Sequence, residues 1–599
     1  MALIVQKYGG SSVGSVERIQ AVAKRVANTV KAGNSLVVVV SAMGKTTDGL
    51  VKLANDISKS PCRREMDMLL STGEQVTIAL LSMALQEIGQ PAISMTGAQV
   101  GIVTEAAHTR ARILHIQTDR LLRHVRDGKV VVVAGFQGIS NIEELEITTL
   151  GRGGSDTSAV ALAAALQANF CEIYTDVPGI LTTDPRLVPQ AQLMREITCD
   201  EMLELASLGA KVLHPRAVEI ARNYGVPLVV RSSWTDDPGT WVTTSKTPEP
   251  TLINLELARP VDAVEFDTAQ ARVALLRIPD RPGVAARLFG EISRQNVDVD
   301  LIIQSIHEGN TNDIAFTVGT PVLNRAEAVA AAIAPALRNQ PDPDQAEVLV
   351  EQHTAKVSIV GAGMIGRPGV AATMFSTLAE AGVNIQMIST SEVKVSCVVD
   401  ASDCEKAIAA LCKTFEIGAY PAALSATNHS SPAVRGVALD LNQARIAIRQ
   451  LPDQPGVAAK LFGLLAELNI SVDMIIQSQR CRLVDGIPKR DIAFTVARMD
   501  AEHAQQQLTK IATELGWGEV ILDQAIAKVS IVGSGMVGHP GIAAKMFQAL
   551  AEQQINIQMI ATSEIKISCV VSQDEGVKAL QAIHAAFELS GTEKFVVPA

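Results

Sequence analysis

The strongest constraint on the fold is an internal repeat in the C-terminal half of the chain. Residues 271–304, ARVALLRIPDRPGVAARLFGEISRQNVDVDLIIQ, return 173 positions later as residues 444–477, ARIAIRQLPDQPGVAAKLFGLLAELNISVDMIIQ. Both copies are followed by DIAFTV, at 313–318 and 491–496. A sequence that repeats in this way builds one structural unit more than once, so this half of the chain is an array of related units.

Each repeat divides again into two related units of roughly 80 residues. Pro282-Gly283 corresponds to Pro368-Gly369 at a shift of 86, and the later copies give Pro455-Gly456 and Pro540-Gly541. In every unit an apolar strand leads to a loop that ends in Pro-Gly, and proline suits the first turn of a helix, where no amide donor is needed. Two strands and a second helix follow. The pattern predicts four βαββαβ units, each an open-faced sandwich.

Two of the four loops contain additional glycines. KVSIVGAGMIGRPG at 356–369 and KVSIVGSGMVGHPG at 528–541 both carry G-x-G-x-x-G straight after an apolar strand, as a dinucleotide-binding turn does. Such a site also needs an acidic residue about 20 positions further on to hold the ribose. Gln386 and Gln558 stand there instead. We therefore expect these loops to present helix N-terminal amides to a small carboxylate.

The N-terminal 245 residues follow a different pattern, in which continuous apolar strands end in small or charged residues. Residues 3–5 lead into Lys7, Gly9 and Gly10, and residues 35–40 lead into SAMGKTT. Glycines let backbone amides approach a polyphosphate and lysine adds positive charge, although the order is the reverse of a Walker A loop. A plain strand–turn–helix with a solvent lysine is the alternative. Continuous apolar strands indicate a parallel sheet, whose ligands bind beyond the carboxyl ends of the strands.

Further charged side chains stand at the starts of helices and in turns. Glu74 opens an apolar helix within STGEQ, and TLGRGGSD places Arg152 between glycines and Asp156 at the start of another helix. The guanidinium fork of an arginine fits a carboxylate. Glu74 and Asp156 could also be charges that only stabilise their helix N-termini. EIYTDVPGILTTDPR at 172–186 adds a proline and glycine turn, and GAKVLHPR adds Lys211.

Composition and charge exclude several classes of protein. The net charge of −11 argues against a nucleic-acid or anionic-membrane binder. We expect no membrane span, since apolar runs stay short of the roughly 20 residues required. The start MALIVQKYGG does not predict a secretory signal. The eight cysteines form no C-x-x-C pair, which predicts neither zinc nor disulfides and suits a cytoplasmic protein.

The four C-terminal units resemble ACT domains, the amino-acid-sensing modules of biosynthetic enzymes. The matching features are D-x-P-G at 280–283 and 453–456 and N-I-Q at 384–386 and 556–558. Cap and turn chemistry alone would favour the same residues. ACT domains pair side by side and bind free amino acids between partners, so the resemblance implies a homodimer joined through these units. We place the units at 262–343, 350–425, 436–516 and 522–599.

The N-terminal part resembles the amino acid kinase family and, within it, the aspartate kinases. The match runs in order through KYGGSS, VSAMG, STGE, TLGRGGSD, YTDVPGI, DPR and GAKVLHP over residues 3–231, with Ser11 where the family often has threonine. The resemblance implies an α/β kinase domain over residues 1–245, with an open, mostly parallel sheet covered by helices on both faces. It implies transfer of a phosphoryl group from ATP, with bound Mg²⁺, to the side chain of L-aspartate, the entry to lysine, threonine, methionine and isoleucine synthesis.

The resemblance also implies a role for each motif residue. Lys7 contacts the transferred phosphoryl group, Asp156 orients Lys7 or its neighbours, and Lys211 neutralises the terminal phosphates. Arg152 clamps the α-carboxylate of aspartate and Glu74 pairs with its ammonium. The other implied nucleotide contacts are Tyr8, Gly9, Gly10, Ser41, Tyr174, Thr175, Asp176, Ile180, Asp184, Pro185, Arg186 and Ala210, and the other aspartate contacts are Thr47, Gly153, Gly154 and Ser155. The sequence predicts no dedicated carboxylate cage for a metal.

Lysine and threonine are the inhibitors that the resemblance implies, bound between paired ACT units. The expected contacts in the first repeat are Asp280, Gly283, Ala285, Asp298, Val299, Asp300, Gln304, Met364, Ile365, Asn384 and Ile385. Those in the second repeat are Asp453, Gly456, Ala458, Ser471, Val472, Asp473, Gln477, Met536, Val537, Asn556 and Ile557.

Three other functions fit parts of the sequence. The first is a kinase of the same fold that acts on glutamate, uridylate or carbamate, against which Arg152, Glu74 and the ACT array favour aspartate. The second is a non-catalytic amino-acid sensor, against which the intact set of Lys7, Asp156 and Lys211 argues. The third is a fusion with a dehydrogenase, which in the family follows the ACT region, whereas this sequence ends with the fourth unit.

Overall fold

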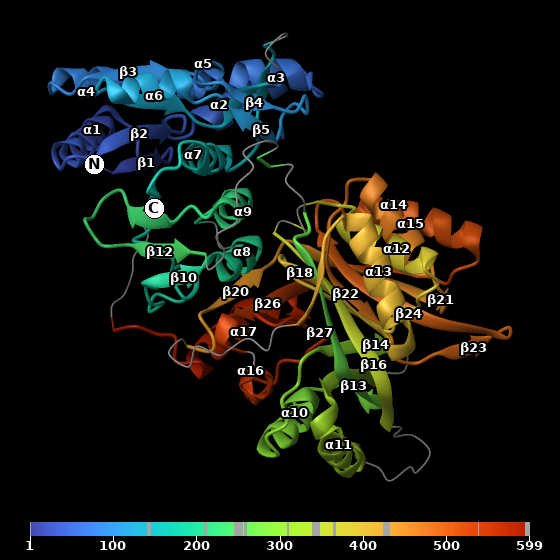
Figure 1. The fold of residues 1–599 in the computed structure, drawn as a ribbon. Helices are drawn as coiled ribbons and strands as arrows, with labels where there is room; N and C mark the ends of the chain where they lie inside the picture. Colours follow the sequence, from blue (N-terminus) through green and yellow to red (C-terminus); the bar gives the residue numbers. More distant parts are fainter. Residues whose placement is uncertain are drawn as a thin grey trace.

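The computed structural model describes residues 2–140, 145–208, 212–244, 255–256, 260–307, 311–337, 348–362, 364, 367–422, 432–536 and 538–592. Ile365, Val537, Ala210 and Lys211, all predicted to contact ligands, lie outside these residues. Figure 1 shows the N-terminal half, coloured blue to green, as one body beside a second body that contains the repeats.

A mostly parallel sheet forms the centre of the N-terminal half, in the order β10-β12-β11-β9-β1-β2-β6-β3. The strands are β1 (Leu3–Tyr8), β2 (Ser35–Val40), β3 (Ala92–Met95), β6 (Val130–Ala134), β9 (Phe170–Thr175), β10 (Glu196–Thr198), β11 (Leu228–Ser232) and β12 (Thr240–Thr243). The central strands are almost fully buried because both faces of the sheet are covered. This confirms the predicted kinase fold class.

Helices cover the two faces of this sheet separately. α1 (Val16–Lys31) and α4 (Thr72–Glu87) pack on one face, and α7 (Gly154–Ala165) packs on the other, where its small side chains are buried almost all round. The other helices are α2 (Thr46–Ile57), α3 (Arg63–Leu70), α5 (Gly97–Val100), α6 (Asp119–Arg126), α8 (Cys199–Ser207) and α9 (Pro215–Tyr224). A small second sheet has the order β5-β4-β7-β8, with β4 (Ile102–Thr104), β5 (Ile113–Ile116), β7 (Gln137–Ile139) and β8 (Ile147–Thr149).

One helical run in the described residues is long and apolar enough to cross a membrane by length and composition alone. This run, Arg63–Glu87, was not expected from the sequence. It consists of α3 and α4 and is half buried inside the N-terminal body, which we call the kinase body. Core helices of soluble proteins meet the same criterion, so the run is weak evidence for a membrane span.

The C-terminal half contains the four predicted units. The first has β13 (Ala263–Pro279), α10 (Val284–Arg294), β14 (Ile302–His307), β15 (Thr311–Gly319), α11 (Leu323–Leu337) and the start of β16 (Val348–Val360). The second has the rest of β16, α12 (Val370–Glu380), β17 (Met387–Thr390), β18 (Lys394–Asp400), α13 (Cys404–Phe415) and β19 (Ala419–Pro421).

The third and fourth units repeat this order. The third has β21 (Gln443–Pro452), α14 (Val457–Glu467), β22 (Val472–Gln477), β23 (Arg482–Val484), β24 (Ile487–Ala497), α15 (Ala501–Leu515) and β25 (Val520–Asp523). The fourth has β26 (Ile526–Val532), α16 (Ile542–Glu552), β27 (Met559–Thr562), β28 (Lys566–Ser572) and α17 (Gly576–Ala586). The predicted ACT-type fold is confirmed, and the last strand expected in the fourth unit lies outside the described residues.

Two strands lie in sheets other than those of the units to which their positions in the sequence assign them. Residues 263–267 of β13 pair with residues 356–360 in the second unit, and β20 (Gly436–Asp440) pairs with β26 in the fourth. Each strand covers a sheet edge whose backbone groups would otherwise lack partners. The borders proposed at 262 and 436 remain predictions, but by hydrogen bonding these strands belong to the following units.

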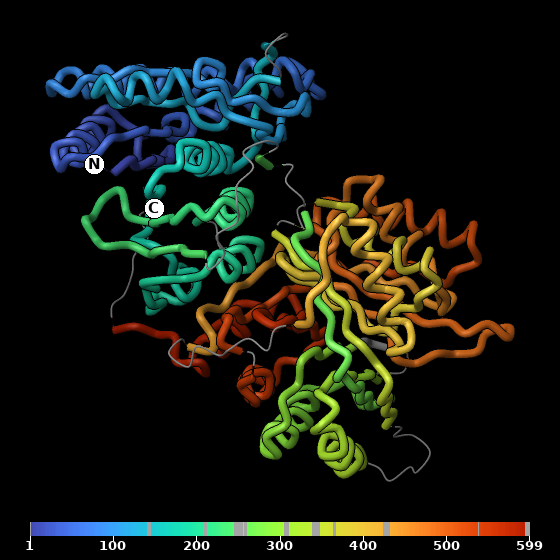
Figure 2. The backbone as a smooth tube through the Cα atoms, in the orientation of Figure 1, coloured from blue at the N-terminus to red at the C-terminus, as the bar shows by residue number. Residues whose placement is uncertain are grey.

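The four units pair as one with four and two with three. β14 and β27 are hydrogen-bonded antiparallel, and the Phe289 and Phe547 rings of α10 and α16 lie 5.5 Å apart. In the other pair α12 packs on α14, with the Phe375 and Phe462 rings 5.3 Å apart. Figure 2 shows the red fourth unit beside the N-terminal body as well. A single chain therefore contains both side-by-side pairs.

Candidate functional site

An ion pair stands where β1 ends in the central sheet. Lys7 Nζ lies 2.6 Å from Asp156 Oδ1, and the two side chains are only 12% and 11% exposed. Asp156 lies in the first turn of α7, whose N-cap is Gly153, so its carboxylate faces the lysine across the strand end. The pair holds the amine at the carboxyl edge of the sheet, where parallel sheets bind ligands.

Glycines let the neighbouring loops approach this lysine. A Cβ at Gly9 would lie 3.3 Å from Lys7 Nζ, and one at Gly10 would lie 2.8 Å from the carbonyl oxygen of Ala42. Gly135, which sequence reasoning missed, follows β6, and a Cβ there would lie 2.9 Å from Ser155 Oγ. The loops after β1, β2 and β6 therefore meet with backbone amides and small hydroxyls in place of large side chains. The Ser41 amide donates to the Tyr8 carbonyl at 3.1 Å within this group.

The two predicted aspartate contacts differ in exposure. Arg152 is exposed on the loop between β8 and α7, and it makes no ion pair within the described part of the chain. Glu74 is 3% exposed in the first turn of α4, and its Oε1 accepts the Ala42 amide at 3.2 Å. Its Oε2 is buried without a hydrogen-bond partner among the described residues. A buried oxygen of this kind is costly unless a proton or a ligand meets it. Thr47, in the first turn of α2, is partly exposed.

Burial also makes Glu74 a titrating group near neutral pH, because it raises the pKa of this carboxyl to about 7. If the ionised form pairs with the ammonium of aspartate, kcat/KM for aspartate will rise between about pH 6 and pH 8 and then level off. The Glu74→Gln variant should lose this rise. The measurement is the pH profile of kcat/KM for aspartate, with the profile for ATP as the internal control. If kcat/KM for aspartate kept the same pH profile in Glu74→Gln, Glu74 would not be the group that binds the ammonium.

A cavity of about 220 Å³ lies beside the turn that follows β9. It is lined by the predicted nucleotide residues Thr175, Asp176, Ile180, Asp184, Pro185 and Arg186. The Arg186 guanidinium donates to both carboxylate oxygens of Asp184, with its Nη2 at 2.7 Å from Oδ2. Apolar residues from outside this turn also line it: Leu205, Leu208, Val212, Val437, Ala438, Leu439 and Leu580. Val437, Ala438, Leu439 and Leu580 come from the C-terminal half, which no sequence motif indicated.

Tyr8 and Tyr174 correct one part of the prediction. Their rings stack at 4.7 Å in the core under α1 and α4, and their hydroxyls donate to Gln6 and Glu172. Side chains alternate between the faces of a strand, so these rings point away from the cavity that Thr175 lines. Only their backbone atoms are available to a nucleotide there.

The fourth unit touches the turn that lines this cavity. The Thr182 hydroxyl lies 2.9 Å from His584 Nε2, and the Thr182 carbonyl accepts the Val437 amide at 2.8 Å. Burial lowers the pKa of His584, which keeps its ring neutral. On α8, Glu204 Oε2 lies 2.9 Å from Lys566 Nζ. These contacts connect the N-terminal body, on the side of this cavity, to the C-terminal units.

The predicted amino-acid contacts gather between units one and four. Asp280 Oδ1 accepts the Asn556 amide at 2.8 Å, and Gln304 Nε2 donates to the Ile557 carbonyl at 2.7 Å. Gly283 and Ala285 line the same small hollow. Asp280 therefore meets Asn556 of the fourth unit and not Asn384 of its own repeat.

A matching hollow lies between units two and three. Asp453 Oδ1 accepts the Asn384 amide at 3.3 Å, and Asp453 Oδ2 lies 2.7 Å from Arg490 Nε. Ile385, Gly456, Ala458 and Gln477 line the same hollow. Sequence reasoning missed Arg490 because its motif, PKRD, gives no sign of which carboxylate it meets.

The remaining predicted contacts lie apart from these hollows. Asp298, Val299, Asp300 and Met536 line a larger cavity of about 770 Å³ between units one, two and four. Asp473 pairs with the buried Lys528, Ser471 and Val472 lie at the start of the same strand segment, and Met364 is buried in the core of the second and third units.

Comparison with known proteins gives consistent results along the whole chain. The amino acid kinase family matches residues 2–232, and ACT domain families match 272–334, 357–415, 449–511 and 529–587. Aspartokinase from Bacillus sp. (strain MGA3) is 52% identical over 418 residues, which are 70% of this chain and 98% of that one. Aspartokinase 2 from Bacillus subtilis (strain 168) is 51% identical over 424 residues, 71% of this chain and all of that one. The crystal structure of aspartate kinase from Synechocystis is 67% identical, with a TM-score of 0.86 over the full length of both chains.

Proposed function

The chain belongs to the aspartate kinase family, and we propose that Lys7, paired with Asp156, neutralises the phosphoryl group that moves from ATP to aspartate. An oxygen of the aspartate side-chain carboxylate bonds to the γ-phosphorus of ATP, and the bond from that phosphorus to ADP breaks. The acceptor carboxylate is already ionised at neutral pH, so the enzyme supplies position and positive charge instead of a strong base. The 2.6 Å contact between Lys7 and Asp156, beside Gly9 and Gly10, is the observation that carries the proposal.

The rest of the site divides between the two substrates. We assign the α-carboxylate of aspartate to Arg152 and its ammonium to the unpartnered oxygen of Glu74, with Thr47 and Ser155 nearby. The loop around Asp184 takes the nucleotide, and Mg²⁺ enters on the ATP phosphates, as it commonly does in kinases.

The direct test is ATP-dependent formation of aspartyl hydroxamate. Product formed from glutamate and not from aspartate would indicate another kinase of the same fold. No product from either substrate would indicate the non-catalytic amino-acid sensor.

We propose lysine and threonine as inhibitors that bind in the hollows at Asp280 and Asp453. The Asp453 carboxylate lines the second hollow, and the Asp280 carboxylate accepts from Asn556, which lines the first, so each stands ready for an ammonium, while helix N-terminal amides suit a carboxylate. An effector must bind one state of the enzyme better than the other to inhibit it. The contacts at Thr182 and Glu204 are the route we propose from these units to the kinase body.

A homodimer joined through the ACT units and a cytoplasmic location belong to the same proposal, and the eight free cysteines suit a reducing compartment.

The effector sites have a direct test in the Asp280→Ala and Asp453→Ala variants. Removal of either carboxylate should weaken inhibition by at least about tenfold, the cost of one hydrogen bond to a charged group. The uninhibited rate should stay near that of the wild type, since neither residue lies in the kinase body. The measurement is the concentration of lysine plus threonine that halves hydroxamate formation. Unchanged inhibition in the double variant would exclude these hollows.

A further inference from the structure

Asp67 is a buried carboxylate that the proposed reaction does not use. It lies on α3, seven residues before Glu74, and its side chain is fully buried. Burying a charged group is costly unless hydrogen bonds and charges compensate it, and packing alone would favour an apolar residue. The position therefore needs an explanation beyond core packing.

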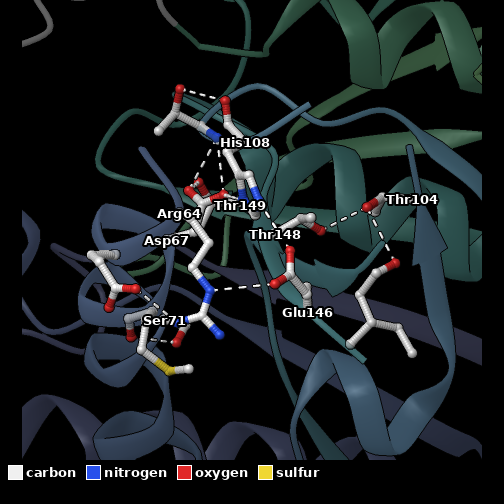
Figure 3. Close-up of polar contacts among 12 residues, drawn as sticks. Arg64, Asp67, Ser71, Thr104, His108, Glu146, Thr148 and Thr149 are labelled. Atoms are coloured by element: carbon white, nitrogen blue, oxygen red, sulfur yellow. Dashed lines mark hydrogen bonds and ion pairs between the residues drawn. The ribbon is translucent and has the colours of Figure 1, made fainter. Parts of the chain in front are cut away.

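Three donors from two other segments meet this carboxylate. Figure 3 labels Asp67 and two of the residues that meet it, His108 and Thr149. The Thr149 hydroxyl donates to Oδ1 at 2.5 Å, and the Thr109 amide donates to Oδ2 at 3.0 Å. The ring of His108 lies with Nδ1 2.8 Å from Oδ2. Asp67 thus joins α3, the loop before β5 and the last residue of β8.

Both ends of this connection lead to predicted aspartate contacts. Thr149 stands three residues before Arg152, and α3 runs through Ser71 directly into the helix that carries Glu74. The Ser71 carbonyl accepts the Gln137 side-chain amide at 2.9 Å, and Gln137 lies on β7, which pairs with β8. The connection therefore fixes α4 relative to the loop of Arg152.

Further charged side chains lie next to the hydrogen bonds of Asp67. His108 Nε2 lies 3.5 Å from Glu146 Oε2, and Arg64 Nε lies 3.5 Å from Glu146 Oε1. Arg64 comes from α3 and Glu146 directly precedes β8, so these charges join the same two elements at the protein surface. Asp67 is the fully buried centre of the network, and Glu146 is its partly exposed rim.

We propose that Asp67 is a positioning residue for aspartate binding, which holds the Glu74 helix and the Arg152 loop at the spacing that one bound aspartate requires. This inference rests on the proposed roles of Glu74 and Arg152. Recognition of one small ligand by two groups depends on that spacing, since small misplacements of binding groups weaken the contacts strongly.

The Thr149→Val variant tests the inference, because it removes the donor to Asp67 while keeping the branched shape of the side chain. We expect the KM for aspartate to rise roughly tenfold, the loss expected for one hydrogen bond to a carboxylate, with the KM for ATP unchanged. Thr149→Ser keeps a hydroxyl and should restore most of the affinity. A purely structural role would instead lower the fraction of active enzyme and leave the KM values alone.

Thr148→Val is the matched control within the same strand. Thr148 is as deeply buried as Thr149, but its hydroxyl lies 2.6 Å from Thr104 Oγ1, away from Asp67. We expect its aspartate KM to stay near that of the wild type. Thermal unfolding of both valine variants shows whether they lose similar stability.

Asp67→Asn gives a second measurement within the same network. It should raise the aspartate KM by itself, and adding Thr149→Val to it should cost less than Thr149→Val costs alone, because the two residues act through one hydrogen bond. Additive effects of the two substitutions would overturn the inference, as would equal aspartate KM values in Thr149→Val and Thr148→Val.

Arg152→Ala separates this inference from the proposed function. If Arg152→Ala raises the aspartate KM and Thr149→Val does not, the assignment of the site stands and the positioning role of Asp67 falls. If Thr149→Val raises it and Arg152→Ala does not, the network does position the aspartate site, and the carboxylate clamp at Arg152 is wrong.

Discussion

Lys7→Ala will lower kcat by roughly a hundred- to a thousandfold while the KM for aspartate changes little. That loss is typical when one preorganised group that stabilises transition-state charge is removed. Charge on the transferring phosphoryl group increases toward the transition state, and the Lys7 amine is held 2.6 Å from Asp156 at the strand end where that group is expected. Steady-state kinetics of hydroxamate formation, with each substrate varied in turn, gives both constants.

Two further variants make this result interpretable. Lys24→Ala removes the same charged group from the exposed face of α1 and should leave kcat near the wild-type value. Asp156→Asn keeps the amine and removes its partner, so its kcat should fall less than that of Lys7→Ala. Removing Lys7 leaves a mostly buried carboxylate without its cation, so the melting temperature of each variant must accompany the kinetics. Near-normal turnover in folded Lys7→Ala would show that the phosphate assignment is wrong.

Arg152→Ala will raise the KM for aspartate by about a hundredfold, with a smaller change in kcat. The guanidinium fork can donate two hydrogen bonds to the α-carboxylate, and about 2.8 kcal/mol corresponds to a hundredfold change in affinity. Arg152 is exposed and makes no ion pair within the described residues, so its removal leaves no partner unpaired in the free enzyme. The loss should therefore appear in substrate binding and not in stability.

The controls for Arg152 separate geometry from charge. Arg152→Lys keeps the charge but loses the planar fork, and we expect it to recover only part of the affinity. Arg126→Ala removes an exposed guanidinium from the last turn of α6 and should leave both KM values unchanged. An aspartate KM that stays at the wild-type value in Arg152→Ala would exclude the clamp.

Local patterns predicted the elements of this fold well, and they predicted contacts between distant elements poorly. The Pro-Gly loops, the continuous valines of β2 and β6 and the glycines after β1 each reflect a requirement of the backbone at that position. Tyr8 shows the limit of such reasoning, since the motif KYGGSS places it beside the phosphate loop while strand alternation turns its ring into the core.

Some contacts on which the proposals depend had no signal in the sequence. Glu204 and Lys566 are 362 positions apart and meet at 2.9 Å, and neither belongs to a recognisable motif. Asp67 stands in an ordinary helical segment, RREMDMLL. Its hydrogen bonds from Thr109 and Thr149 form only in the tertiary structure. Such contacts depend on how whole elements pack, which the periodicity of one segment does not contain.

The sequence by itself determined the repeated unit, the order of its strands and helices, and the residues at the ends of the kinase strands, because these follow from local backbone and burial requirements. The tertiary structure decided that unit one pairs with four and unit two with three, and that two strands complete the sheets of later units. It also decided which oxygen of Glu74 has no hydrogen-bond partner among the described residues. Four similar units offer similar surfaces, so the choice of partner depends on side-chain complementarity between segments that lie far apart in the sequence.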